Sequence, residues 1–283
     1  MALVQMRVDG HQSGQERFVE VRREVARAAD GGADIVVLPE LWTCGAFNVE
    51  AGLRQAERIP GPTSVALGEL AARCRVWLHA GSILSIGADA GHRGDASSAE
   101  GIFNTALLFD PNGDLVTLYR KIHLFGFDTG EAAILSSGTE LAIADTPLGR
   151  TGLATCYDLR FPELFRAFSA EGVEAVLVCS SWPLARIGHW RTLVAARAIE
   201  NQFPVVACNA TGTHNGITLG GESMVIDATG MQLAKAGHDE SLLTTSIQPA
   251  TTRAARTDFP VLRDRRLGPG TSPNESGWVG IRR

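Results

Sequence analysis

The feature that most constrains the fold is a short apolar run, Ile35-Val36-Val37-Leu38, in which no polar residue alternates with the apolar ones. A strand with one face in water alternates apolar and polar side chains, whereas a strand covered on both faces is apolar throughout. The run therefore predicts a strand that is buried on both faces. Such a strand needs a packed layer on each side of its sheet, which favours an α/β protein.

Apolar periodicity along the rest of the chain supports this class. Helical spacing predicts helices over residues 18–28, 65–74, 162–170 and 190–199. The chain begins with an apolar stretch at residues 3–8. Apolar runs predict strands over residues 76–86, 151–156, 175–179 and 205–207, and two hairpins turn at residues 111–113 and 229–230. Strands and helices alternate in some places and hairpins occur in others, so we expect a mixed sheet system covered by helices.

The domain organisation is expected to be simple. The chain has 283 residues, with no internal repeat and no linker that would divide it, so we expect one domain over residues 1–266. Residues 87–100 are polar and rich in Gly, Ala and Ser, which predicts an exposed loop. The C-terminal tail, residues 267–283, is expected to wrap the surface or a partner subunit.

Composition and charge exclude several classes of function. The net charge is −5, which argues against a partner that is a nucleic acid or a membrane surface. No apolar run reaches the ~18 to 20 residues needed to cross a bilayer, and the first ten residues do not resemble a signal peptide. The five cysteines are scattered and form no CxxC pair, so a disulfide framework or a zinc site is not expected. We therefore expect a cytoplasmic protein.

The strongest local signal surrounds Cys156. The segment Gly152-Leu153-Ala154-Thr155-Cys156 is an apolar strand that delivers a cysteine to a sharp transition, and a helix is predicted soon afterwards. A helix N-terminus stabilises a nearby thiolate, and its free N–H groups can also hold a developing oxyanion. Cys156 is therefore a candidate nucleophile. The alternative is a buried, inert cysteine.

Two further ionisable residues stand at predicted strand ends. Glu40 closes the apolar run, where burial would raise its pKa and favour proton transfer near neutral pH; the alternative is a carboxylate that reaches solvent. Lys121 ends the second strand of the first hairpin, where an ammonium group could stabilise an oxyanion; the alternative is a solvated lysine. Glu131 follows in a loop of the same region, and by itself it indicates only a surface position.

Taken together, these segments resemble the nitrilase superfamily of carbon–nitrogen hydrolases over nearly the whole chain, from Met1 to about Arg266. Three motifs carry the resemblance: VVLPEL around Glu40, YRKIHLF around Lys121 and GLATCYDLRFPEL around Cys156. Residues 181–183, 189–202, 222–227 and 261–266 match as well. Glu131 matches a second glutamate of many members, although the stretch between Lys121 and Glu131 is shorter than in many relatives.

The resemblance implies a fold and an assembly. Members of the superfamily are four-layer α-β-β-α sandwiches, and two sandwiches commonly pair through outer helices into an eight-layer dimer. We therefore expect this architecture and a homodimer or higher homo-oligomer. The periodicity described above predicts only a mixed α/β protein.

The resemblance also implies a mechanism with a Glu-Lys-Cys triad. Cys156 would attack an amide or nitrile carbon to form a thioester, and Glu40 would shuttle the protons. Lys121 and the backbone N–H of Tyr157 would stabilise the oxyanion, and Glu131 would orient Lys121 or the substrate amide. No metal or other cofactor is required, because the thiolate takes the place of metal-activated water.

The resemblance is closest to the ω-amidase-like branch, which hydrolyses small aliphatic monoamides of dicarboxylates. It predicts a small-molecule amide substrate that is cleaved to an acid and ammonia. Trp182 is expected to line the pocket and Arg186 to bind a substrate carboxylate, with core packing and a solvated surface position as the respective alternatives. His123, His189 and Trp190 are expected to be structural.

Other functions stay open at this point. N-carbamoyl amine hydrolysis and nitrile hydrolysis would use the same triad, and release of carbon dioxide with ammonia would distinguish a ureido substrate from an amide. Acyl transfer would follow if an amine intercepted the thioester. The alternative from another class is a non-catalytic binding protein on the same scaffold.

Overall fold

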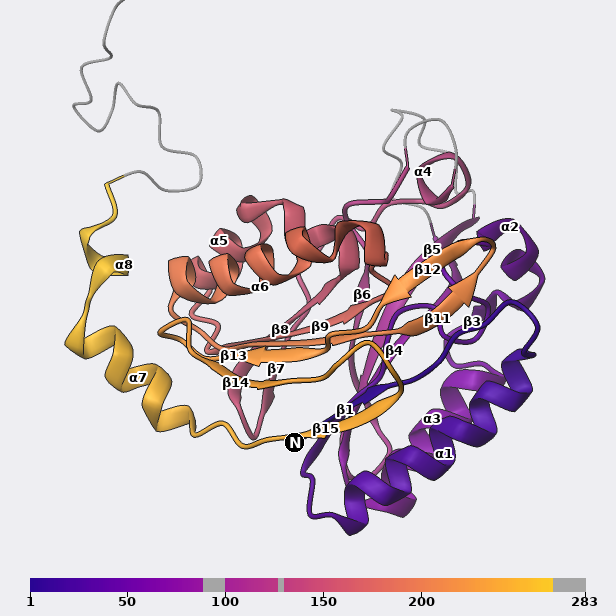
Figure 1. Cartoon of the computed structure of the whole chain (residues 1–283), viewed down its shortest axis with the longest axis horizontal. Helices are drawn as coiled ribbons and strands as arrows, with labels where there is room; N and C mark the ends of the chain where they lie inside the picture. Colours follow the sequence, from indigo (N-terminus) through magenta and orange to yellow (C-terminus); the bar gives the residue numbers. More distant parts are fainter. Residues whose placement is uncertain (89–99, 127–129, 267–283) are drawn as a thin grey trace, which may run out of the picture.

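The computed structural model describes residues 1–88, 100–126 and 130–266. Most of the predicted loop at 87–100 and the whole predicted tail at 267–283 lie outside these ranges. Figure 1 shows two sheets packed face to face, with a pair of helices on the outer side of each. This arrangement is the expected four-layer α-β-β-α sandwich.

The first sheet has the strand order β15-β1-β2-β4-β5-β6, and β3 also pairs with β4. Its strands are β1 (Ala2–Gln5), β2 (Ile35–Val37), β3 (Glu57–Arg58), β4 (Trp77–Ala88), β5 (Glu100–Phe109), β6 (Leu115–Arg120) and β15 (Ser241–Thr244). The central strands β1, β2 and β4 run parallel, whereas β5 and β6 form the predicted antiparallel hairpin.

The second sheet has the order β14-β13-β10-β9-β8-β7. Its strands are β7 (Ile143–Thr146), β8 (Gly149–Thr155), β9 (Ala175–Ser180), β10 (Val205–Asn209), β13 (Met224–Ile226) and β14 (Gln232–Lys235). Here β8, β9 and β10 run parallel, and antiparallel strands lie on both edges. A separate hairpin joins β11 (Thr211–His214) to β12 (Ile217–Gly220).

Two pairs of longer helices form the outer layers (Figure 1). The helices are α1 (Gly14–Asp30) and α3 (Pro62–Cys74) on the first sheet, and α5 (Pro162–Ala170) and α6 (Ile187–Asn201) on the second. Short helices are α2 (Val49–Gly52), α4 (Glu131–Ile134), α8 (Val261–Asp264) and the 3-10 turns η1 (Leu53–Gln55), η2 (Cys156–Arg160) and η3 (Leu184–Arg186). Helix α7 (Pro249–Asp258) follows the last strand.

The apolar run at residues 35–38 explains why two layers meet on β2. Ile35 and Val37 belong to the core between the two sheets, whereas Val36 and Leu38 pack in the core beneath α1 and α3. All four side chains are at most 2% exposed. The predicted strand buried on both faces is therefore confirmed.

Candidate active site

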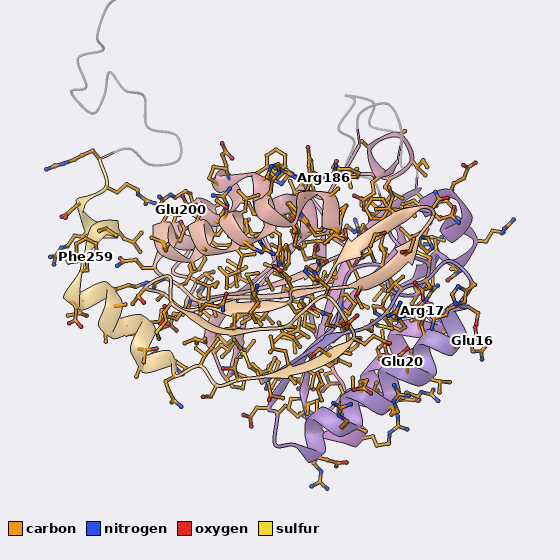
Figure 2. The ribbon with its side chains drawn as sticks, in the orientation of Figure 1. Glu16, Arg17, Glu20, Arg186, Glu200 and Phe259 are labelled. Atoms are coloured by element: carbon orange, nitrogen blue, oxygen red, sulfur yellow. The ribbon has the colours of Figure 1, made fainter. Side chains whose placement is uncertain are left out.

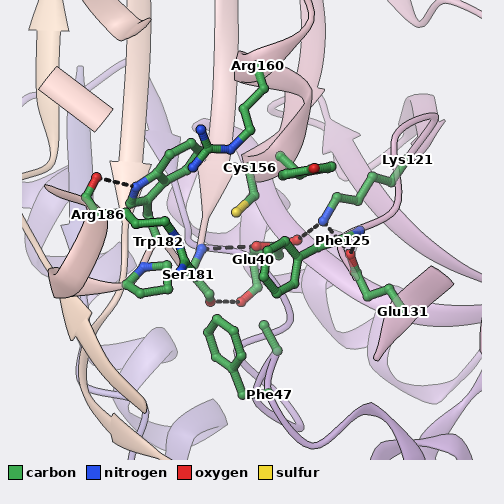
Figure 3. Close-up of a pocket in the computed structure, with 13 residues that line it drawn as sticks. Glu40, Phe47, Lys121, Phe125, Glu131, Cys156, Arg160, Ser181, Trp182 and Arg186 are labelled. Carbon is green, nitrogen blue, oxygen red and sulfur yellow. Dashed lines mark hydrogen bonds and ion pairs between the residues drawn. The ribbon is translucent and has the colours of Figure 1, made fainter. Parts of the chain in front are cut away.

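The three residues at the predicted strand ends meet in one pocket. Glu40 follows β2, Lys121 follows β6 and Cys156 follows β8. The Cys156 sulfur, the Glu40 carboxylate and the Lys121 ammonium point toward one another in Figure 3. The pocket is lined by Glu40, Ala46, Phe47, Lys121, Phe125, Glu131, Cys156, Tyr157, Arg160, Ser181, Trp182, Pro183 and Arg186.

Lys121 lies between two glutamates. Its Nζ donates to Glu40 Oε1 at 2.7 Å and to Glu131 Oε2 at 2.6 Å. The side chains of Lys121, Glu40 and Glu131 are only 1%, 2% and 4% exposed, so this cluster of three charges is desolvated. Asn104 on β5, which the sequence reasoning did not single out, donates from Nδ2 to both carboxylates. The structure thus places Glu131 next to Lys121, and not on the surface.

Burial changes the proton affinities of this cluster. The pKa of Glu40 is raised, mainly by desolvation and despite the attraction of Lys121, which agrees with the expectation from the sequence. Desolvation opposes the charge on Lys121, but Glu131, Glu40 and the Cys156 sulfur together raise its pKa. Lys121 is therefore a permanent cation, whereas Glu40 can accept a proton.

Cys156 occupies the first position of η2 and has a φ of +45°, a left-handed conformation that is uncommon for a residue with a side chain. The turn directs its sulfur into the pocket. Desolvation and the neighbouring Glu40 raise the pKa of the Cys156 thiol, although Lys121 opposes this shift. Burial therefore favours the neutral thiol, which is the state from which the expected proton transfer to Glu40 starts.

Glu40 is held in place by the end of β9. The Ser181 N–H donates to Glu40 Oε2 at 3.0 Å, and the Ser181 hydroxyl donates to the Glu40 backbone oxygen at 2.9 Å. The backbone before Glu40 also passes close to Gly81, where an added Cβ would lie 1.9 Å from the Pro39 oxygen. The two sheets therefore fix the position of this carboxylate from both sides.

Asp158 links the segment of Cys156 to the segment of Lys121. Its Oδ2 accepts from the Thr155 N–H at 2.9 Å and from the Tyr119 hydroxyl at 2.8 Å. Its Oδ1 lies 2.7 Å from His123 Nδ1. Asp158 is fully buried and was not singled out in the sequence, although it stands two residues after Cys156. His123 thus has a partner that fits the expected structural role.

Aromatic rings and two arginines form the rest of the pocket wall. Trp182 lines the pocket and donates from Nε1 to the Arg186 backbone oxygen at 2.8 Å. The Arg186 guanidinium lies 5.6 Å from the centre of the Phe125 ring, and Arg160 lies 4.7 Å from the centre of the Trp182 ring. Within the described ranges neither arginine forms an ion pair with a carboxylate. Arg160 was missed by the sequence reasoning, and Tyr157 lies beside it, with its ring centre 5.7 Å from the guanidinium.

His189 and Trp190 lie in the first turn of α6. Trp190 is buried and donates from Nε1 to the Glu222 backbone oxygen at 2.8 Å, whereas His189 Nδ1 lies 3.3 Å from Arg160 Nη1. Trp190 thus packs in the core. His189 contacts an arginine of the pocket wall.

Among the described residues, no group of three or more His, Cys, Asp or Glu side chains could hold a metal ion. No helix within the same ranges is both long enough and apolar enough to cross a bilayer.

Comparison with known proteins identifies the relatives of this chain. It is 40% identical over 270 residues to a 2-oxoglutaramate amidase of Paenarthrobacter nicotinovorans, covering 94% of this chain and 89% of that protein. It is 32% identical to the human omega-amidase NIT2, covering 94% of each.

A solved structure, Saccharomyces cerevisiae Nit3 of the nitrilase superfamily, superposes with a TM-score of 0.81 at 27% identity, over 94% of this chain and 96% of that one. The family model for carbon-nitrogen hydrolases matches residues 1–257. The chain therefore belongs to the carbon–nitrogen hydrolase family.

Proposed function

We propose that this protein is an amidase that hydrolyses small aliphatic monoamides of dicarboxylic acids to the diacid and ammonia. The observation that carries the proposal is one pocket whose lining includes a thiol, a carboxylate and an ammonium together with two arginines that form no ion pair with a carboxylate of the described residues. The first group suits attack on an amide, and the arginines suit a carboxylate at the other end of the same small molecule. A 2-oxoglutaramate amidase and an omega-amidase among the relatives support this substrate class.

In the first half of the reaction, Cys156 sulfur forms a bond to the amide carbon while Glu40 takes the thiol proton. The negative charge that develops on the amide oxygen is stabilised by Lys121 and by the backbone N–H of Tyr157. Glu40 then gives the proton to the nitrogen, the carbon–nitrogen bond breaks, and ammonia leaves. The substrate acyl group remains on Cys156 as a thioester.

In the second half, water replaces ammonia. Glu40 takes a proton from the water as its oxygen bonds to the thioester carbon, and the carbon–sulfur bond then breaks. The proton returns to the Cys156 sulfur, so the thiol is restored and the acid is released. Glu131 accepts hydrogen bonds from Lys121 Nζ and from the Phe125 N–H at 2.9 Å, which suits a role in orienting Lys121.

An ammonia-release assay over matched compounds tests the proposal. We expect turnover of 2-oxoglutaramate, glutaramate or succinamate, and much slower turnover of butyramide, which has a similar chain but no carboxylate. The Cys156→Ala variant should bind these amides without releasing ammonia. Release of carbon dioxide together with ammonia from N-carbamoyl amines, or faster turnover of nitriles, would instead assign the alternative reactions of the same triad. Undiminished turnover by Cys156→Ala would refute the nucleophile.

We further propose a single domain over residues 1–266, a homodimer or higher homo-oligomer, and a cytoplasmic location. Phe259 at the end of α7 is 70% exposed (Figure 2). Ile199 on the outer helix α6 is 52% exposed and lines the same surface hollow as Phe259. These exposed apolar side chains support burial of this part of the surface by a second copy. All five cysteines are free, which supports a reducing compartment. Light scattering of the purified protein measures the oligomeric state, and a monomeric mass would contradict this part.

A further inference from the structure

Asn104 occupies an unusual position for an amide side chain. It lies on β5 between Phe103 and Thr105, and its side chain is fully buried. Nδ2 donates to Glu40 Oε1 at 2.9 Å and to Glu131 Oε1 at 2.6 Å, so one NH2 group connects both glutamates. The Lys121 ammonium connects the same two carboxylates from its own side. The four groups therefore form a closed ring.

The orientation of this amide follows from its neighbours. If the amide were turned around, its oxygen would face two carboxylate oxygens at less than 3 Å, which is repulsive. With the nitrogen facing the carboxylates, Asn104 Oδ1 is buried and has no hydrogen-bond partner within the described ranges. A buried acceptor without a partner is costly, and native structures contain few of them. The observed orientation leaves the amide oxygen without a partner but directs both amide hydrogens toward the two glutamates.

The charges of this cluster indicate what the two hydrogen bonds from Asn104 do. Two carboxylates and one ammonium leave a net charge of about −1 in a desolvated cluster. Two carboxylates this close would ordinarily share a proton, as paired acids do in other enzymes. A shared proton would occupy the group that must accept the thiol proton. The two N–H groups of Asn104 take the place of that proton, because they can donate hydrogen bonds without neutralising either carboxylate.

We propose that Asn104 is a positioning residue that keeps Glu40 and Glu131 ionised together, so that Glu40 is free to act as a base near neutral pH. The inference rests on the proposed role of Glu40 in amide hydrolysis. Asn104 does not line the pocket, so it acts through Glu40 and Glu131. The other titratable groups that face Glu40 are Lys121 beyond β6, Cys156 on η2 and Cys179 on β9.

The backbone of Asn104 supports the same role. Its carbonyl oxygen accepts from the Lys121 N–H at 2.9 Å, which continues the β5–β6 ladder by one step beyond β6. One residue therefore fixes the start of the Lys121 segment through its backbone and both glutamates through its side chain. This geometry keeps the ammonium between the carboxylates.

The test compares pH profiles of ammonia release from glutaramate. Asn104→Leu has a similar volume but no donor, and we expect kcat to fall about 10- to 100-fold while KM changes less than about threefold. The acid limb of kcat/KM should move to higher pH, because Glu40 then loses a donor that favours its ionised form. Asn104→Asp, which puts a third carboxylate into the ring, should move this limb further in the same direction.

Thr105→Val is the matched control. Thr105 is the next residue on β5, is fully buried and loses a hydrogen bond of 2.7 Å to Ser85 that lies outside the pocket. It should lower the melting temperature without moving the acid limb. A loss of folded protein lowers the rate by the same factor at every pH and does not move the acid limb. A shift of the acid limb therefore distinguishes the loss of the Asn104 hydrogen bonds from a loss of folded protein. If Asn104→Leu does not fold, Asn104→Asp carries the same test.

An unmoved acid limb with nearly unchanged kcat in the folded Asn104 variants would overturn the inference. Glu40→Gln distinguishes this failure from failure of the proposed function. If Glu40→Gln is inactive while the Asn104 variants behave like the parent protein, only the role of Asn104 is lost. If Glu40→Gln keeps the parent rate and limb, the assignment of the base itself is wrong.

Discussion

Replacing Lys121 by methionine would remove the only cation of the described residues that contacts both buried glutamates. The variant has a similar volume, so packing changes little and charge changes most. Breaking a buried ion pair by removing one partner costs about 3 to 5 kcal/mol, because the remaining charge stays desolvated. Here two negative charges would remain, with Glu40 and Glu131 both nearly inaccessible to water.

The variant would reduce the repulsion between the two remaining negative charges by binding one proton. The free energy of this protonation gives the expected loss of stability. For a carboxyl with an unfolded pKa of about 4.3, protonation costs about 1.4 kcal/mol for each pH unit above that value. The cost is therefore about 4 kcal/mol at pH 7 and about 1 kcal/mol at pH 5. Burial without Lys121 raises the folded-state pKa of the glutamate that binds this proton. The loss of stability is therefore absent below about pH 4 and grows as the pH rises toward that pKa.

Thermal unfolding measures this directly. With roughly 2 to 4 °C per kcal/mol for a large domain, Lys121→Met should melt about 8 to 16 °C lower than the parent at pH 7 and only about 2 to 4 °C lower at pH 5. Lys235→Met is the control, because Lys235 is 31% exposed beside Glu222 and its loss should have a small effect at either pH. An equal deficit for Lys121→Met at both pH values would refute the reasoning.

Three further predictions concern the same pocket. Gly81→Ala should lower kcat at least about tenfold, because the added methyl group pushes the Pro39 carbonyl and thereby displaces Glu40. The control is Gly32→Ala, which is also at positive φ but has nothing within 4 Å; it should lower stability and leave kcat unchanged. Arg160→Gln and Arg186→Gln should each raise KM for glutaramate about tenfold or more and leave butyramide turnover unaltered; an equal loss for both amides would contradict carboxylate binding. The ultraviolet thiolate absorbance of the parent protein should match that of Cys156→Ala at neutral pH, because burial raises the pKa of the Cys156 thiol. A higher thiolate absorbance in the parent protein would contradict the raised pKa.

The sequence predicted those parts of the fold that have a local pattern. Residues 35–38 are apolar without alternation because both faces of β2 are covered, and this pattern is visible without any structure. Helix α7 was not predicted, since Thr252 is its one buried residue and it has no apolar stripe. The strands β7 and β15 and the hairpin β11–β12 were also missed, because each is only four residues long and lies at a sheet edge or outside the two main sheets.

The candidate site, like the fold, was predicted from the sequence only in part. Glu40, Lys121 and Cys156 could be singled out because each stands where an apolar strand stops. Their meeting in one pocket depends on strand pairing between distant parts of the chain, which no local pattern encodes. Asn104 could have been noticed as a polar residue inside the apolar strand FNTALLF, but its contact with both glutamates requires the fold.

The charge of the cluster has a consequence for the proposed reaction. In the proposed resting state both glutamates are carboxylates, Lys121 is an ammonium and the Cys156 thiol is neutral, so the sum is about −1. When Glu40 takes the thiol proton and the sulfur attacks, the negative charge moves from that carboxylate to the substrate oxygen. Both positions are neighbours of Lys121, so the sum is unchanged and the desolvated surroundings need little rearrangement. A thiol with a raised pKa fits this scheme, because a resting thiolate would add a second net negative charge to a site from which water is largely excluded.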